Sequence, residues 1–267
     1  ILPFMAMNGE KIPPWDYRVP GVTSISADIH KYGYAAKGAS TITYRNLDYL
    51  RYQMFVCQDW PGGVFASSAL LGTRPGGAYA AAWGVLQYFG KEGYRRLADE
   101  TLQAVNRLKA GVAEIPGLAI MGNPVGPLFA YRSTTPELNI YAVGDQMDAR
   151  GWQVNRNQNP DGLHAMVTSQ HLRVVDQYLA DLRESVAAVR AEPELAQQGG
   201  AATYGMLSHV PLRGMVRKKV LEMYSEQYRA GGGSLDLASG AESGGSGLLD
   251  RALQWYVTRQ SRRNASR

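Results

Sequence analysis

The sequence is poor in cysteine and histidine and has no long apolar run, and each shortage excludes a class of structure. Cys57 is the only cysteine, so the 267 residues cannot form an intrachain disulfide, which fits a reducing compartment. The four histidines are scattered, and we expect no metal site. The longest apolar stretch, 78–89, contains Gly84 and Gln87 and falls short of the roughly 20 residues that cross a bilayer. We therefore expect no transmembrane segment, and a cytoplasmic or membrane-peripheral location.

The charge pattern argues against nucleic acid as a partner. The formal net charge is +5, and most basic residues are interspersed with acidic ones, as on a solvated surface. Positive charge is dense only at 217–219 and in the tail 259–267. A solubilising role is the usual reading of such runs, although the basic tail could also contact a membrane surface.

The beginning of the chain is typical of a piece of a longer protein. It opens with Ile1 and has neither a charged leader nor a cleavage-site pattern, and 45% of the residues are hydrophobic, which is enough for a folded core. We therefore expect a globular fragment.

Residue periodicity predicts a mixed α/β chain. The predicted strands are 22–27, 40–44, 118–121, 128–131 and 162–168, and the predicted helices are 46–55, 77–89, 93–112, 139–150, 171–190 and 212–228. The helices at 77–89 and 93–112 can also form one helix broken near Gly90, and the first is apolar nearly all round, which predicts burial. Glycine, proline and serine predict an ordered loop at 59–77 and a flexible linker at 230–247, before an amphipathic stretch at 248–262.

The segment 24–38 is the best candidate for chemistry. After a strand it places His30, Lys31 and Lys37 in one loop with Gly33 and Gly38. A His-Lys pair alone is more often a surface lysine beside a capping histidine. The placement favours a site, because both lysines follow an apolar strand that should be buried, and the glycines let the backbone fold tightly around a ligand.

These residues also carry a family resemblance. Residues 24–40 read SISADIHKYGYAAKGAS and resemble the Schiff-base motif of the sphingosine-1-phosphate lyases, which are pyridoxal-phosphate (PLP) enzymes of the aspartate-aminotransferase fold. The similarity covers about residues 1–225. Its further motifs are DYRVPGVT at 16–23, DWPGG at 59–63, GTRPGG at 72–77, Gly151-Trp152 and Tyr204-Gly205-Met206. Two residues of the loop differ from the common family motif: Ile29 stands where threonine is usual, and Ala36 where proline is usual.

The resemblance implies an α/β fold of the PLP-dependent transferase type (fold type I). It implies that residues 1–112 are the later part of the large PLP-binding domain, that 113–229 form a small α+β domain, and that 230–267 are a linker and basic tail. The histidine that stacks on the cofactor ring and the aspartate that pairs with its nitrogen lie upstream of the lysine in this fold. We therefore expect activity to require an upstream half, and we expect a homodimer.

The resemblance also implies a role for each candidate site residue. Lys31 would form the Schiff base with PLP, which requires an unprotonated amine. His30 would donate a hydrogen bond to the cofactor phosphate, or it is a structural cap. Gly72 and Thr73 lie in a glycine-rich turn that can bind an anion. In the family this turn approaches the phosphate of the cofactor in the neighbouring subunit. Alternatively, the turn is only a rigid connector. Lys37 would pair with a substrate phosphate.

The function implied is cleavage of a carbon–carbon bond in a phosphorylated long-chain amino alcohol, giving a fatty aldehyde and phosphoethanolamine. One alternative is a PLP-dependent amino-acid decarboxylase of the same fold, which Lys37 argues against. Another is a non-catalytic remnant that only dimerises.

Overall fold

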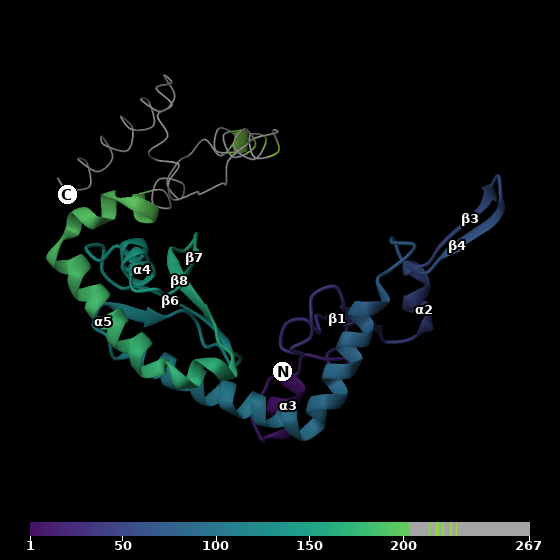
Figure 1. The fold of residues 1–267 in the computed structure, drawn as a ribbon, viewed down its shortest axis with the longest axis horizontal. Helices are drawn as coiled ribbons and strands as arrows, with labels where there is room; N and C mark the ends of the chain where they lie inside the picture. The colour runs from purple at the N-terminus through teal and green to yellow at the C-terminus, as the bar shows by residue number, and fades with distance from the viewer. Residues whose placement is uncertain (203–213, 215–216, 219–220, 222–224, 226–227, 229–267) are drawn as a thin grey trace. The chain divides into compact units, whose positions relative to one another are not determined.

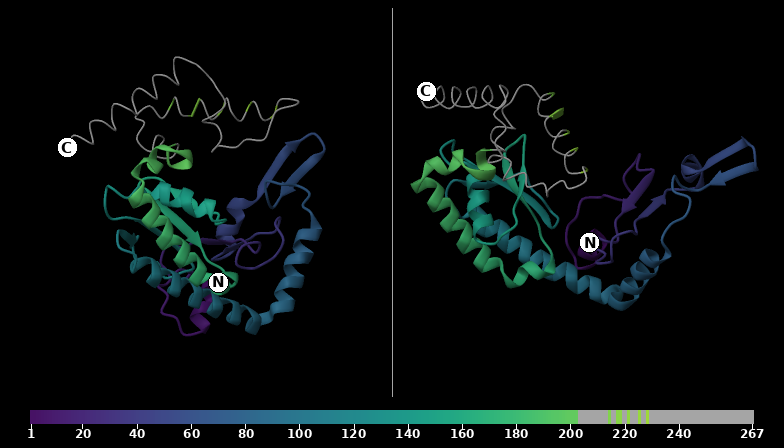
Figure 2. Two further views of the ribbon diagram at one scale, coloured as in Figure 1. Left: turned by 60° about the vertical axis from the view of Figure 1, so that its left-hand side comes forward. Right: turned by 45° about the horizontal axis from the view of Figure 1, so that its top comes forward.

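The computed structural model describes residues 1–202 and, beyond them, residues 214, 217, 218, 221, 225 and 228. These residues form two compact units (Figures 1 and 2). The first unit comprises 1–104, 125–127 and 167–172, and the second comprises 105–124, 128–166 and the residues from 173 on. The helix predicted at 212–228 lies mostly outside the described residues. The linker, the final amphipathic stretch and the 204–206 motif lie wholly outside them.

The first unit begins with a short helix and two paired strands. Its elements are α1 (Leu2–Met7), β1 (Ser24–Ala27), β2 (Thr41–Tyr44), α2 (Leu47–Leu50), η1 (Arg51–Gln53), β3 (Phe55–Trp60), β4 (Gly63–Ser67) and the first part of α3 (Gly76–Ala113). Strands β1 and β2 are antiparallel, with Ser24 opposite Tyr44 and Ala27 opposite Thr41. Both predicted strands are therefore confirmed, and the connection between them carries the candidate motif.

The loop predicted at 59–77 is partly wrong. Strands β3 and β4 form an antiparallel hairpin, drawn as a paired ribbon in Figure 1, and only the part after Ser67 connects to α3 without a strand. The sequence Trp60-Pro61-Gly62-Gly63 makes the tight turn of this hairpin, and Gly63 adopts a φ of +106° that glycine tolerates. Glycine and proline occur in the turn of a short hairpin as well as in a long loop, so composition alone does not distinguish the two.

Helix α3 consists of two helical segments separated by a kink, in agreement with the predicted break near Gly90. Gly90 breaks it with a φ of 55° and a ψ of −172°. The predicted burial of its first part is wrong in this structure: Ala82 is buried, but Trp83 is 67% exposed and Tyr88 is 84% exposed. Both side chains are largely exposed, so an apolar composition alone did not determine burial in this part of the helix.

The burial expected for β1 is also wrong. Ile25 is half-buried, while Ser24, Ser26 and Ala27 are exposed. In the described residues β1 pairs only with β2, and this two-stranded sheet does not form part of a larger one. The small core of this region consists instead of Ala35, Ala39 and Ala82.

The second unit is a four-stranded antiparallel sheet with helices. Its elements are the later part of α3, β5 (Leu118–Ile120), β6 (Leu128–Ser133), α4 (Ile140–Ala149), β7 (Asn155–Asn157), β8 (Gly162–Met166), α5 (Val175–Ala191) and η3 (Pro193–Gln197). The short helix η2 (Ser169–Arg173), which precedes α5 in the chain, lies mostly in the first unit. The strand order is β5-β6-β8-β7. The predicted strands and helices of this part are confirmed, whereas the three-residue strand β7 was missed because it is too short to show alternation.

The core of the second unit lies between its helices and the sheet. Figure 1 shows α4 and α5 beside the sheet, and α4 packs against α5 and β8. Asn139 begins α4, since its side chain accepts hydrogen bonds from the backbone of Tyr141 and Ala142. The largest side chains of this core that are fully buried are Val105, Val112, Tyr131, Tyr141, Val143, Met147, Leu163, Val175, Leu182 and Val186. None of the helices in the described residues is both long and apolar enough to cross a membrane.

Candidate functional site

Lys31 lies in a tight turn that directly follows strand β1. The backbone N–H of Lys31 donates to the carbonyl of Asp28 at 3.1 Å, and Tyr34 N–H donates to the carbonyl of Lys31 at 2.9 Å. A third bond, from Ala35 N–H to the carbonyl of Ile29 at 3.1 Å, closes the turn. The backbone on both sides of Lys31 is therefore held by local hydrogen bonds.

Two tyrosines anchor this turn to distant parts of the first unit. The hydroxyl of Tyr32 donates to the carbonyl of Val167 at 2.9 Å, and the hydroxyl of Tyr94, on α3, donates to the carbonyl of Gly33 at 2.7 Å. Burial, with a smaller contribution from the nearby Tyr34, raises the pKa of Tyr32 to about 12 and also raises the pKa of Tyr94. Both hydroxyls thus remain protonated donors at neutral pH.

The amine of Lys31 meets a carboxylate at the end of β1. Lys31 Nζ lies 2.9 Å from Asp28 Oδ2, and Ser40 Oγ donates to Asp28 Oδ1 at 2.6 Å. The hydrogen bond from Ser40, and then the one from Lys31, lower the pKa of Asp28, while burial opposes this shift. The Lys31 side chain is 62% exposed, so its amine remains accessible to a ligand from solution.

His30 bonds within its own loop. Its Nδ1 lies 3.2 Å from the carbonyl oxygen of Ala39. A carbonyl only accepts hydrogen bonds, so Nδ1 carries the proton in this contact, and Nε2 could then donate to a phosphate only when the ring is doubly protonated. A contact of this kind is what the alternative role of His30, a structural cap, would produce.

The structure does not bring the other predicted site residues to Lys31. Lys37 lies further along the same connection and is exposed. Gly72 and Thr73 lie in the exposed connection between β4 and α3, where Arg74 Nη1 donates to the carbonyl of Leu71 at 3.1 Å. None of these residues lines the cavity beside Lys31.

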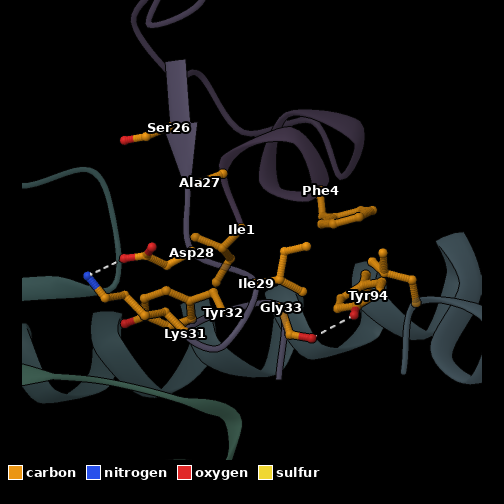
Figure 3. A pocket seen from close by; sticks show the side chains of 11 residues that line it. Ile1, Phe4, Ser26, Ala27, Asp28, Ile29, Lys31, Tyr32, Gly33 and Tyr94 are labelled. Carbon is orange, nitrogen blue, oxygen red and sulfur yellow. Dashed lines mark hydrogen bonds and ion pairs between the residues drawn. The ribbon is translucent and has the colours of Figure 1, made fainter. Parts of the chain in front are cut away.

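That cavity has a volume of about 470 Å³ and lies wholly in the first unit. Its lining includes Asp28, Lys31, Tyr32 and Gly33 from the turn, Ile1 and Phe4 from the N-terminal segment, and Leu86 and Tyr94 from α3. Figure 3 shows Lys31 and Asp28 at one end of the cavity and Phe4 and Tyr94 at the other. The charged side chains of the turn and the aromatic side chains of Phe4 and Tyr94 thus line the same cavity.

Several residues of this cavity, among them Phe4, Asp28, Tyr32 and Tyr94, were not predicted as site residues from the sequence. Asp28 was overlooked as a partner, although it stands three positions before Lys31. Tyr32 lies beside Lys31 in the motif, but its contact with Val167 spans 135 positions, and Tyr94 and Phe4 come from other segments. No local pattern relates these positions. In the described part of the chain, no group of three or more histidine, cysteine or acidic side chains is arranged to hold a metal ion.

The chain is similar in sequence to several sphingosine-1-phosphate lyases. No established family profile matches it. The sphingosine-1-phosphate lyase of Arabidopsis thaliana is 41% identical over 228 residues, which are 85% of this chain and 42% of that protein. The rat enzyme, sphingosine-1-phosphate lyase 1, is 40% identical over 219 residues, 81% of this chain and 38% of its own length. The chain thus spans about two fifths of the length of these curated relatives.

Solved structures agree with the sequence relatives. The sphingosine-1-phosphate lyase of Burkholderia pseudomallei superposes with a TM-score of 0.70 at 36% identity, covering 84% of this chain and 47% of that one. Glutamate decarboxylase of Lactobacillus brevis, at 22% identity and a TM-score of 0.56 over 66% of this chain and 42% of its own, shares the fold alone. The described part of the chain is a mixed α/β structure similar to part of the PLP-dependent enzymes of fold type I, as the family resemblance implied. Over the span that it covers, this chain belongs to the sphingosine-1-phosphate lyase family.

Proposed function

We propose that the protein acts as a PLP-dependent lyase that cleaves a carbon–carbon bond of a phosphorylated long-chain amino alcohol of the sphingosine-1-phosphate type. The products would be a fatty aldehyde and phosphoethanolamine. The observation that carries this proposal is the placement of Lys31: its backbone is fixed by a hydrogen-bonded turn, while its amine is 62% exposed beside a cavity. This arrangement suits a lysine that must bond to an aldehyde from solution.

The residues around Lys31 fit the cofactor. The cavity of about 470 Å³ is within the range of about 300–1,000 Å³ typical of small-molecule sites, and its wall combines apolar side chains with a few charged groups. Lys31 would hold PLP covalently, and His30 would face its phosphate through Nε2. Gly72 and Thr73 would approach the phosphate in the neighbouring subunit. When bound, PLP supplies an electron sink for the charge left on carbon when the bond breaks.

The residues of the chain would orient and assist rather than break the bond themselves. The turn held by Tyr32 and Tyr94 keeps the Lys31 backbone in place, so that only the flexible side chain moves. Lys37, an exposed cation six residues further on, would pair with the phosphate of the substrate. The site would thereby bind a phosphorylated substrate in preference to one with a free hydroxyl group.

The proposal extends to the assembly. Because the chain spans about two fifths of its relatives, we expect turnover to require the remaining length that those relatives have, in an assembly that is at least dimeric. Exposed apolar side chains in the first unit support this expectation; they include Ile42, Phe55, Val64, Trp83 and Tyr88. A monodisperse monomer of residues 1–267 that cleaves a phosphorylated sphingoid base with added PLP would contradict it.

Covalent mapping tests the cofactor assignment directly. The protein is incubated with PLP, reduced with borohydride and digested, and the modified peptide is identified by mass spectrometry. We expect the adduct on Lys31, and Lys31→Ala should abolish it while Lys37→Ala should not. An adduct on Lys37, or none on Lys31, would refute the assignment.

A further inference from the structure

Asp28 is fixed by two separate donors, one on each carboxylate oxygen. Ser40 Oγ donates to Oδ1 at 2.6 Å. The amine of Lys31 lies 2.9 Å from Oδ2, and Figure 3 shows this contact. Asp28 directly follows β1 and Ser40 directly precedes β2, so their bond ties together the two ends of the connection that carries Lys31. The carboxylate therefore has a defined position even without Lys31.

The same contacts favour the ionised form of the Asp28 carboxyl group. The hydrogen bond from Ser40 is the largest cause that lowers the pKa of Asp28, the hydrogen bond from Lys31 is the next, and the nearby charge of His30 acts in the same direction. Asp28 is thus an anion at neutral pH, and its charge attracts a nearby cation.

The pair between Asp28 and Lys31 is partly solvated, which makes it reversible. The side chain of Lys31 is 62% exposed and that of Asp28 is 33% exposed. Ion pairs of this kind are weak, so the amine can leave the carboxylate when a covalent bond is available. A fully buried pair would instead hold the lysine too firmly for exchange.

We propose that Asp28 is a positioning residue that holds the amine of Lys31 whenever this amine is not bonded to the cofactor; the inference rests on the function proposed above. There are two such moments: before the cofactor is attached, and after the amine of the substrate has taken the place of Lys31. In both, Nζ is an ammonium ion that needs a partner. The carboxylate provides one at the edge of the cavity, so the lysine stays within reach for its return.

Lysine labelling in the PLP-free protein tests this role without requiring turnover. An amine-reactive acylating reagent modifies only unprotonated amines, and peptide mass mapping gives separate rates for Lys31 and Lys37. We expect Asp28→Asn to raise the labelling rate of Lys31 about two- to fivefold at neutral pH, the range for a partly exposed pair. The rate of Lys37, measured in the same protein, should not change. Ser40→Ala should raise the Lys31 rate by a smaller factor, and Asp28→Glu should return it toward that of the wild type.

Asp48 provides a matched control, because it also forms an ion pair with a cation three positions away, Arg51, at 3.0 Å. Asp48→Asn should leave the Lys31 rate unchanged. An equal Lys31 rate in Asp28→Asn and the wild type, or failure of Asp28→Glu to restore it, would overturn the role of Asp28. Adding PLP to the wild type separates the two proposals: Lys31 should become protected, and absence of protection contradicts the proposed function but not the ion pair.

Discussion

The hydroxyl of Tyr94 donates a hydrogen bond to the carbonyl oxygen of Gly33 at 2.7 Å, so helix α3 holds the turn that contains Lys31. Tyr94 is only 4% exposed, and its ring stacks on Phe4 with centroids 4.9 Å apart. The position of Lys31 therefore depends on a hydrogen bond between Gly33 and a side chain 61 positions further along the chain.

Tyr94→Phe should loosen this turn. The substitution removes the donor and leaves the carbonyl of Gly33 without it, so we expect the free energy of unfolding to fall by about 1–2 kcal/mol. Urea denaturation measures this loss, and hydrogen exchange should be faster at the amides of Tyr34 and Ala35. Tyr88→Phe on the same helix is the control, because the Tyr88 side chain is 84% exposed; an equal effect of both variants would argue against the anchoring role.

Gly33→Ala should disrupt the same turn by crowding. A Cβ at this position would lie 2.4 Å from the carbonyl oxygen of Ile29, so the backbone would have to shift. We expect a destabilisation of about 1–3 kcal/mol, together with slower attachment of PLP to Lys31. Gly84→Ala is the matched control: nothing lies within 4 Å of its Cβ, and alanine in a helix should increase stability by up to about 1 kcal/mol. Normal stability of Gly33→Ala would mean that the turn is more adaptable than its contacts indicate.

Tyr32 should make the protein sensitive to alkali. Because burial raises its pKa from the ordinary value of 10 to about 12, the unfolded chain loses this proton at a lower pH than the folded chain. The resulting stabilisation is fully present below pH 10 and is lost as the pH rises to about 12. Denaturation across this pH window should show a shallower fall in stability for Tyr32→Phe than for the wild type. Tyr52→Phe is the control, because the Tyr52 side chain is 85% exposed, and its unfolding free energy should change with pH as in the wild type. The same pH dependence in both variants would contradict the burial of the Tyr32 hydroxyl.

Lys37→Ala should discriminate between substrates. Removing this exposed cation should weaken the interaction with a phosphorylated substrate by about 1.5–3 kcal/mol, the size of one charge-assisted contact, and leave PLP attachment unchanged. The measurement compares kcat/KM for phosphorylated and dephosphorylated sphingoid bases in the complete assembly. Lys11→Ala, at another exposed lysine of the first unit, should change neither value. An equal loss for both substrates would exclude a phosphate contact.

The sequence by itself determined the local elements and the family. Alternating β-branched residues on either side of the 28–40 loop identified β1 and β2, Gly90 marked the break in α3, and Asn139 marked the start of α4. These features depend on residues within one turn or one strand of each other, which is why pattern reading found them. Lys31 is predicted as a site residue in the same way, because its motif is contiguous.

Only the tertiary structure decided what surrounds Lys31 and which apolar residues are covered. Phe4, Tyr94 and Val167 reach the turn from three separate segments, and no periodicity relates their positions to residue 31. The prediction of burial in the first part of α3 was wrong for the same reason. Trp83 lies in an apolar run yet is 67% exposed, because burial depends on which parts of the folded chain pack against a side chain. Even the ion pair with Asp28, only three positions away, needed the turn, since the turn brings the two side chains together and Ser40 fixes the carboxylate.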